Sequence, residues 1–200
     1  MLFMLLIIFI PVFTSSLLDL KQKKENDLIQ EAEKKVYLTG KFDPAEKEDF
    51  ILISAQYTLS GNKIYLRKET YEAFSKMQEA ADQDEVELKI VSATRNFIYQ
   101  KNLWNKKWRD LEVLPPLGGK TSKSGGLERF KKILEYSAAP GTSRHHWGTD
   151  IDINGALPSY FDSEAGEKEY KWLAENALPF GFCQPYNAGR TTGYNEEKWH

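Results

Sequence analysis

The placement of the histidines constrains the fold more than any other feature of this sequence. Two of the three, His145 and His146, stand side by side in the stretch SRHHWGTDIDI, residues 143–153, and the third, His200, is the last residue. Histidine is the commonest metal ligand among the side chains. If these histidines bind one ion, the fold must bring residue 200 against residues 143–153.

The alternation in TDIDI predicts a short strand with Asp150 and Asp152 on one face and Ile151 and Ile153 on the other. Two carboxylates that face the core would repel each other unless a cation lies beside them. If the isoleucines face the core instead, both aspartates are solvated, as aspartates usually are. The stretch alone leaves both alternatives open.

The C-terminal EEKWH contains further groups that suit a metal site. Catalytic zinc takes three protein ligands from histidine, aspartate or glutamate and keeps a fourth position open for water. One histidine and one aspartate of residues 143–153, together with His200, make up such a set. Glu197 lies three residues before His200, so the two side chains share one side only if the backbone bends. Because a carboxylate beside the water is the general base of hydrolytic zinc sites, we predict a bend at residues 197–200.

Composition favours one packed domain and excludes several kinds of site. The 200 residues include 41% hydrophobic and 13% aromatic residues, enough for a sizeable single core. A formal net charge of −2 offers no basic surface, so no nucleic-acid partner is expected. Cys183 is the only cysteine, which excludes an intramolecular disulfide and a cysteine-based zinc site.

The N-terminal residues MLFMLLIIFIPVF are almost wholly apolar, and three small residues follow them. This pattern predicts a signal peptide over residues 1–16, and hence an exported protein of the periplasm or cell envelope. The run is short for a membrane span, and an N-terminal membrane anchor is the alternative. No basic residue precedes the run, which suggests a truncated or misassigned start. Residues 17–40, rich in Lys, Glu and Gln, are predicted to form a loosely helical linker to a domain over residues 41–200.

Helical signals recur along this domain. Asp43 and Pro44 are typical of a helix start, as cap and first-turn proline. Helical periodicity predicts helices over residues 69–81, beyond residue 96, over 127–136 and over 166–177. The apolar stripes predicted to face the core are Tyr71, Phe74, Met77 and Ala81 in the first, Phe97, Trp104 and Trp108 in the second, and Leu127, Phe130 and Leu134 in the third.

Strands are fewer and shorter than helices. VELKIV, residues 86–91, alternates as a half-buried strand, and Arg95 follows just beyond its C-terminal end. Residues 113–126, rich in Pro, Gly and Ser, are predicted to form an irregular surface loop. This order of elements favours an α+β fold over a doubly wound parallel sheet.

Three motifs, in order, give the chain a resemblance to a known family. SRHHWGTDID fits the pattern Ser-x-His-x-x-Gly-x-x-x-Asp, EKWH fits Glu-x-x-His, and SATRNFIYQ is similar to an upstream Ser-x-x-Arg segment. Together they resemble the D-alanyl-D-alanine carboxypeptidases of the VanY type, which belong with the zinc LAS peptidases. The resemblance covers roughly residues 45–200. It implies a small central antiparallel sheet flanked by helices.

The resemblance also assigns roles to individual residues. It implies that His145, Asp152 and His200 bind zinc. Glu197 would be the catalytic base, and Arg95 would stabilise the oxyanion, for which a permanently charged and planar donor is suited. A surface ion pair is the alternative for Arg95.

Three other residues near the motifs have open roles. Ser143 matches the motif serine and is expected to bind substrate or support the loop, with turn stabilisation after Pro-Gly as the alternative. Asp150 stands where the family often has a small residue, so it either orients a ligand or binds the metal itself. His146 matches no motif position, and we expect a polar histidine in the core or at its rim.

These observations predict an exported zinc D,D-carboxypeptidase that hydrolyses the terminal bond of peptidoglycan stem peptides. A peptidoglycan endopeptidase of the same fold is one alternative, and a non-catalytic wall-binding module is another. We expect a monomer with possible membrane association through its N-terminus. Since comparable sequences continue past the last histidine, we also expect the natural chain to extend beyond His200.

Overall fold

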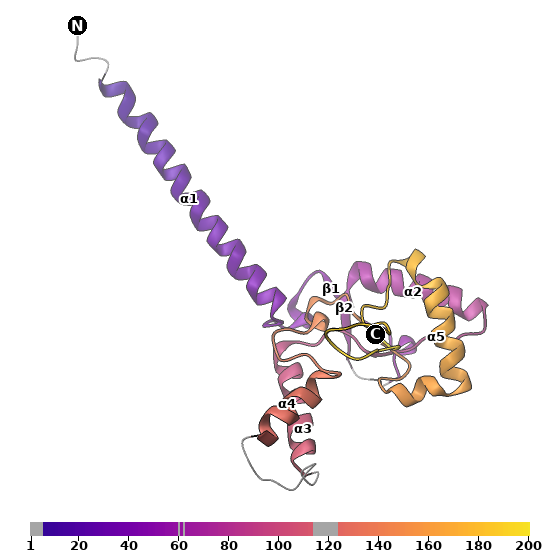
Figure 1. Ribbon diagram of the computed structural model, residues 1–200. Coiled ribbons are helices and arrows are strands. Elements are labelled where there is room, and N and C mark those ends of the chain that lie inside the picture. Colours follow the sequence, from indigo (N-terminus) through magenta and orange to yellow (C-terminus); the bar gives the residue numbers. More distant parts are fainter. Residues whose placement is uncertain (1–5, 60, 62, 114–123) are drawn as a thin grey trace. The chain divides into compact units, whose positions relative to one another are not determined.

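The structure, a computed structural model, describes residues 6–59, 61, 63–113 and 124–200 (Figure 1). The chain divides into two units, Met1–Tyr37 and Leu38–His200. Within the described residues, no helix is both long and apolar enough to cross a membrane.

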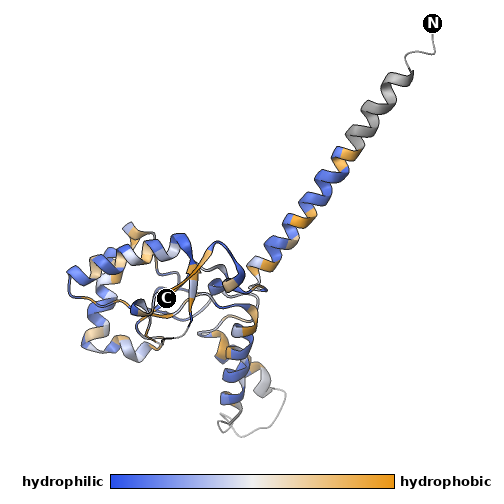
Figure 2. Cartoon of the chain, turned by 180° about the vertical axis from the view of Figure 1, so that it is seen from behind, coloured by the Kyte–Doolittle hydropathy of each residue, from blue (hydrophilic) through white to orange (hydrophobic). Residues whose placement is uncertain are grey.

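The first unit consists of helix α1, Leu6–Leu38. From residue 18 onward nearly all of its side chains are exposed. Along this part hydrophilic residues alternate with isolated hydrophobic ones (Figure 2). Of the helical linker predicted over residues 17–40, residues 17–38 are helical and residues 39–40 form a turn. The linker role and the signal peptide remain predictions.

The second unit contains two small antiparallel sheets. Strand β1, Phe50–Leu52, pairs with β2, Tyr65–Arg67. Strand β3, Ile90–Ser92, pairs with β4, Asp152–Ile153, and the register shifts between Ile90 and Ser92. Short strands among longer helices confirm the predicted α+β class, although the described sheet is divided into two pairs.

Two helices enclose the core. Helix α2, Lys68–Gln83, buries Phe74, Met77 and Ala81 completely, and Tyr71, the fourth residue of its predicted stripe, packs half-buried against the same core. Helix α5, Glu164–Asn176, is capped by the Ser163 side chain, which accepts a hydrogen bond from the Gly166 N–H. The core lies between these helices and the strands. Its fully or nearly fully buried residues include Leu66, Leu88, Ile90, Ile151, Ile153 and Trp172.

The strand predicted over residues 86–91 is shorter than expected. Val86, Leu88 and Ile90 are buried in alternation, but the paired ladder begins only at Ile90. The cause lies in Asn154, which follows β4 with a positive φ of 59°. Its side-chain oxygen accepts the Lys89 N–H at 2.6 Å, so a side chain replaces the strand partner there.

Helices α3, Phe97–Val113, and α4, Ser124–Leu134, correct two other predictions. Residue 113 and residues 124–126 are helical where a loop was expected, and residues 114–123 lie outside the described part. In α4 the predicted inward residues Leu127 and Phe130 are 57% and 41% exposed, whereas Ile133 is buried. The Phe130 ring instead meets the edge of Trp104 on α3, so the α4 stripe contacts its neighbouring helix more than the core.

Candidate active site

His145 lies in a single 3₁₀ turn, Arg144–Trp147. Gly148 ends this turn with a φ of 74°, and a Cβ there would lie 2.4 Å from the Phe50 ring. Both facts require glycine at this position. The imidazole of His145 is 2% exposed, and its Nδ1 is 2.8 Å from the Ala93 carbonyl oxygen. Because a carbonyl can only accept, Nδ1 carries the proton and Nε2 faces the site without one.

Strand β4 places Asp152 opposite His145. Both aspartates of TDIDI are buried, Asp150 at 6% and Asp152 at 5% exposure, and so are Ile151 and Ile153. The solvated alternative for these carboxylates is therefore wrong. Both faces of this short strand are covered, and the face with the two aspartates needs cationic partners.

The C-terminal segment is held against β4 by its backbone and by Trp199. The Ile153 N–H donates to the Trp199 carbonyl at 2.9 Å, and the buried indole stacks on the Phe161 ring. The backbone then turns, and the His200 N–H donates to the Glu197 carbonyl at 3.3 Å. The predicted bend at residues 197–200 is present, and it directs both side chains toward Asp152.

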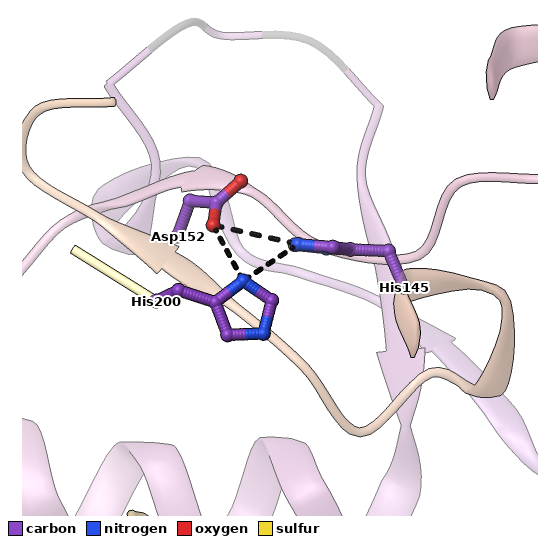
Figure 3. A group of neighbouring side chains, drawn as sticks. All are labelled: His145, Asp152 and His200. Atoms are coloured by element: carbon purple, nitrogen blue, oxygen red, sulfur yellow. Dashed lines mark hydrogen bonds and ion pairs between the residues drawn. The ribbon is translucent and has the colours of Figure 1, made fainter. Parts of the chain in front are cut away.

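His145, Asp152 and His200 form a compact triangle (Figure 3). His145 Nε2 lies 3.4 Å from Asp152 Oδ1 and 3.3 Å from His200 Nδ1. His200 Nδ1 lies 3.3 Å from the same carboxylate oxygen. Asp152 Oδ1 is buried and receives no hydrogen bond of regular geometry from a described residue. Three acceptor atoms thus converge on one point.

Asp150 fixes the orientation of the third ligand. His200 Nε2 is 2.9 Å from Asp150 Oδ1, which also accepts from Arg144 Nε at 2.7 Å. The carboxylate therefore accepts a hydrogen bond from the Nε2–H of His200, so that Nδ1 is the nitrogen that faces the triangle. Of the two roles predicted for Asp150, the geometry fits the orienting one, because its oxygens face away from the triangle toward these donors.

The triangle fits zinc. Bonds of about 2.0–2.2 Å at tetrahedral angles separate neighbouring ligand atoms by about 3.3–3.6 Å, and the three separations fall in this range. Two imidazole nitrogens and one carboxylate are also a donor set of catalytic zinc. Burial lowers the pKa of His145, which favours the neutral ring that a metal ligand requires. For His200, burial also disfavours the charged ring, but the hydrogen bonds and charges of Asp150 and Asp152 prevail and raise its pKa to about 9, so a metal at this position would displace the Nδ1 proton.

Glu197 lies beside the triangle and not within it. Its side chain is buried, and Oε2 is 3.5 Å from His200 Nδ1. Burial raises the pKa of Glu197 to about 7, as suits a group that accepts and returns a proton near neutral pH. Glu196 interacts with the Tyr170 hydroxyl of α5 instead. The two adjacent glutamates thus have separate surroundings.

Arg95 approaches Asp152 from the end of β3. One of its terminal nitrogens lies 3.7 Å from Asp152 Oδ2, its side chain is 16% exposed, and its Nε has no hydrogen-bond partner among the described residues. The surface-ion-pair alternative is therefore wrong. The guanidinium lies beside the triangle, in the hollow that Arg95 lines together with Glu197 and His200.

His146 holds the Arg95 backbone in place. The imidazole is fully buried, its Nδ1 donates to the Arg95 carbonyl, and its Nε2 accepts from the Gly141 N–H at 3.0 Å. A Cβ at Gly40 would lie 2.4 Å from this ring, so glycine there makes room for it. His146 is a core histidine, as expected.

Ser143 lies at the wall of the same hollow and is 3% exposed. Its side chain does not cap the following 3₁₀ turn. The preceding turn is closed by Thr142, whose hydroxyl donates to the Ala139 carbonyl at 2.9 Å. Thr142, and not the Ser143 side chain, therefore stabilises this turn. Substrate contact by Ser143 remains a prediction.

Aromatic residues of the hollow were missed by sequence reasoning. Tyr136, Tyr186 and Tyr194 line it, and the Tyr186 ring lies 4.9 Å from that of His200. No spacing rule connects these tyrosines to the histidines. Only the repeated aromatic residues before EEKWH could have drawn attention to them.

Residues 63–200 match the sequence model of VanY, D-alanyl-D-alanine carboxypeptidase, and this match includes all of the site residues above. The chain belongs to this family. The Bacillus subtilis (strain 168) protein YodJ is 29% identical over 185 residues, 90% of this chain and 60% of that protein. The D-alanyl-D-alanine carboxypeptidase of Enterococcus faecalis (strain ATCC 700802 / V583) is 30% identical over 157 residues, 74% of this chain and 53% of the relative. The chain thus spans about half to three fifths of these relatives.

Solved structures share the fold. The LdcB LD-carboxypeptidase has a TM-score of 0.58 at 25% identity and covers 78% of this chain and 67% of its own. A variant of the D,D-pentapeptidase VanY in complex with Zn(II) has a TM-score of 0.56 at 26% identity, over 74% and 80% of the two chains. VanYB in complex with D-alanine-D-alanine has a TM-score of 0.55 at 29% identity, and the match covers 74% of this chain and 79% of that one. These likenesses confirm the predicted fold.

Proposed function

We propose that this chain is an exported zinc-dependent D-alanyl-D-alanine carboxypeptidase that acts on peptidoglycan stem peptides. The observation that carries the proposal is the convergence of two imidazole nitrogens and one buried carboxylate oxygen, with Glu197 alongside. The VanY relative solved with Zn(II) and the one solved with D-alanine-D-alanine support the metal and the substrate class.

The residues divide the reaction between them. Zinc held by His145, Asp152 and His200 would polarise the scissile carbonyl and acidify water. Glu197 accepts the proton of the attacking water and returns it to the leaving amine. Arg95 donates hydrogen bonds toward the oxygen that gains negative charge.

Two alternatives share this fold. An endopeptidase would use the same groups on an internal bond. A non-catalytic wall-binding module has no need of a general base, yet Glu197 is kept, buried and directed at the triangle. Retention of the base therefore favours an enzyme.

The decisive experiment combines metal content with product identification. The purified protein is expected to carry one zinc per chain and to release one D-alanine from a defined muropeptide pentapeptide, measured by mass spectrometry. Cleavage within the stem or a cross-link would indicate the endopeptidase. A zinc-loaded protein that leaves every such substrate intact would indicate the binding module.

Export is a separate proposal that rests on the apolar residues 1–13 and the small residues after them. Cell-wall precursors with D-alanine termini are available outside the cytoplasm, so export would bring enzyme and substrate together. N-terminal sequencing of the protein from its native host should find a start near residue 17 in an extracytoplasmic fraction. An intact Met1 in a cytoplasmic fraction would contradict it.

A further inference from the structure

Two basic side chains, Arg95 and Arg144, line the hollow beside the site, and a third, Lys107, contacts its wall. The two that line the hollow already have acidic partners. Arg144 is paired with Asp150 at 2.7 Å. Arg95 is paired with Asp152 at 3.7 Å. The third, Lys107, reaches toward the wall of the hollow from helix α3, and the described residues give it no carboxylate partner.

The contact of Lys107 shows where its charge lies. Its Nζ donates to the Ser137 hydroxyl, and Ser137 is a buried residue of the wall, next to Tyr136 and Ala138. The same hollow is lined by Arg95 and Glu197. The ammonium group therefore lies one side-chain contact away from the space in which the reacting bond must sit.

The charges that act on Lys107 also place it near the site carboxylates. Burial and the nearby charge of Arg95 lower the pKa of Lys107, while Glu197 and Asp152 raise it. The lysine is thus within electrostatic reach of both site carboxylates without pairing with either. A half-buried cation without an acidic partner is costly for a fold, and an anionic ligand would offset that cost.

We propose that Lys107, with Ser137, binds the free terminal carboxylate of the substrate; this inference rests on the proposed function. In a carboxypeptidase substrate the terminal carboxylate lies one residue beyond the scissile carbonyl, within about 3.6 Å along the chain. The group that recognises it must therefore border the same hollow as the general base, and Ser137, which Lys107 contacts, does so. An internal bond has a neutral amide in that place, so this lysine favours cleavage at a free C-terminus over cleavage within a chain.

Binding of two matched peptides tests the proposal without turnover. The probes are diacetyl-L-Lys-D-Ala-D-Ala and its C-terminal amide, titrated calorimetrically into the full-length, zinc-loaded Glu197→Gln protein. The added Lys107→Met change should weaken binding of the acid by about tenfold or more, as expected for one lost charge-assisted hydrogen bond, and leave the amide unchanged. Ser137→Ala should weaken the acid selectively but less.

Lys106 on the same helix is the matched control, since it is 71% exposed and pairs with Asp110 one turn along. Lys106→Met should change the affinity for neither peptide. Equal weakening of acid and amide by Lys107→Met would reduce the lysine to a structural role and overturn the proposal. Unchanged acid binding, or no acid binding by the parent protein, would overturn it as well.

Failure of this inference can be distinguished from failure of the proposed function. Hydrolysis of the acid peptide by the unmodified protein tests the reaction alone. If it proceeds while Lys107→Met keeps the preference for acid over amide, the reaction stands and the carboxylate site is wrong. If no hydrolysis occurs but the preference for acid depends on Lys107, the carboxylate site stands and the reaction is wrong.

Discussion

Each ring nitrogen of His200 contacts a different aspartate. Nε2 lies 2.9 Å from Asp150 Oδ1, and Nδ1 lies 3.3 Å from Asp152 Oδ1. The first contact fixes a proton on Nε2, and the second directs Nδ1 at the metal position. The two aspartates of TDIDI therefore have unlike roles, and only Asp152 belongs to strand β4, whereas Asp150 precedes it.

This division of roles predicts the effect of Asp150→Asn. The amide oxygen can still accept a hydrogen bond from Nε2–H. The negative charge of the carboxylate is lost, however, so the His200 ring becomes a weaker ligand. Loss of such partners typically lowers metal affinity 10–100-fold. We expect a fall of about tenfold for zinc, measured by competition with a chromophoric chelator. Asp162→Asn, an exposed position in another turn, should leave the zinc affinity unchanged. An unaltered affinity in Asp150→Asn would remove Asp150 from the orientation of His200.

Gly148 ends the turn that carries His145, and its backbone conformation leads to a prediction on stability. Its φ of 74° disfavours any side chain, and a Cβ would also meet the Phe50 ring at 2.4 Å. Gly181 has a similar φ of 87° but nothing within 4 Å of a Cβ, so it isolates the backbone effect. Gly181→Ala should lower the free energy of unfolding by about 1 kcal/mol. Gly148→Ala should lower it by at least about 1 kcal/mol more, since the ring must move. Chemical denaturation measures both changes. An equal loss of unfolding free energy in Gly148→Ala and Gly181→Ala would show that the Phe50 ring moves aside at no cost.

Arg95→Lys tests the role of the guanidinium. The substitution keeps the charge but loses the planar set of donors. If Arg95 stabilises the transition state, kcat should fall by about 10²–10³ while the zinc content stays normal. The control for this variant is its zinc content, which shows whether the metal site is intact. A normal kcat in Arg95→Lys would restrict Arg95 to its backbone role, in which its N–H donates to the His145 carbonyl.

The metal site could be predicted from sequence more completely than the fold around it. Glu197 and His200 are close in the chain, so a bend was the one arrangement that allowed both to act. Alternation placed Asp150 and Asp152 on one face, but the difference between them depends on Arg144, which a strand pattern does not position. The α4 stripe was assigned wrongly because helical periodicity gives the apolar face of a helix, whereas the neighbouring helix decides which part of that face is buried. Lys107 was missed because its contact with Ser137 joins residues 30 positions apart.

The last prediction separates Glu197 from Glu196. Both lie within one turn of His200, at three and four residues, so spacing in a regular helix would admit either as the base. The structure gives them different surroundings: Glu197 is buried with Oε2 3.5 Å from His200 Nδ1, whereas Glu196 interacts with Tyr170.

Glu197→Gln keeps the shape of the side chain and leaves the three ligands in place, but it removes the proton acceptor. Hydrolysis of a D-Ala-D-Ala-terminated peptide should fall by at least about 10²-fold with zinc content unchanged. Glu196→Gln is the matched control and should keep nearly the full rate. If instead Glu196→Gln were inactive and Glu197→Gln active, the base would have been assigned to the wrong glutamate. Such a result would require the segment to rearrange into a regular helix when substrate binds, because only then could Glu196 reach the triangle.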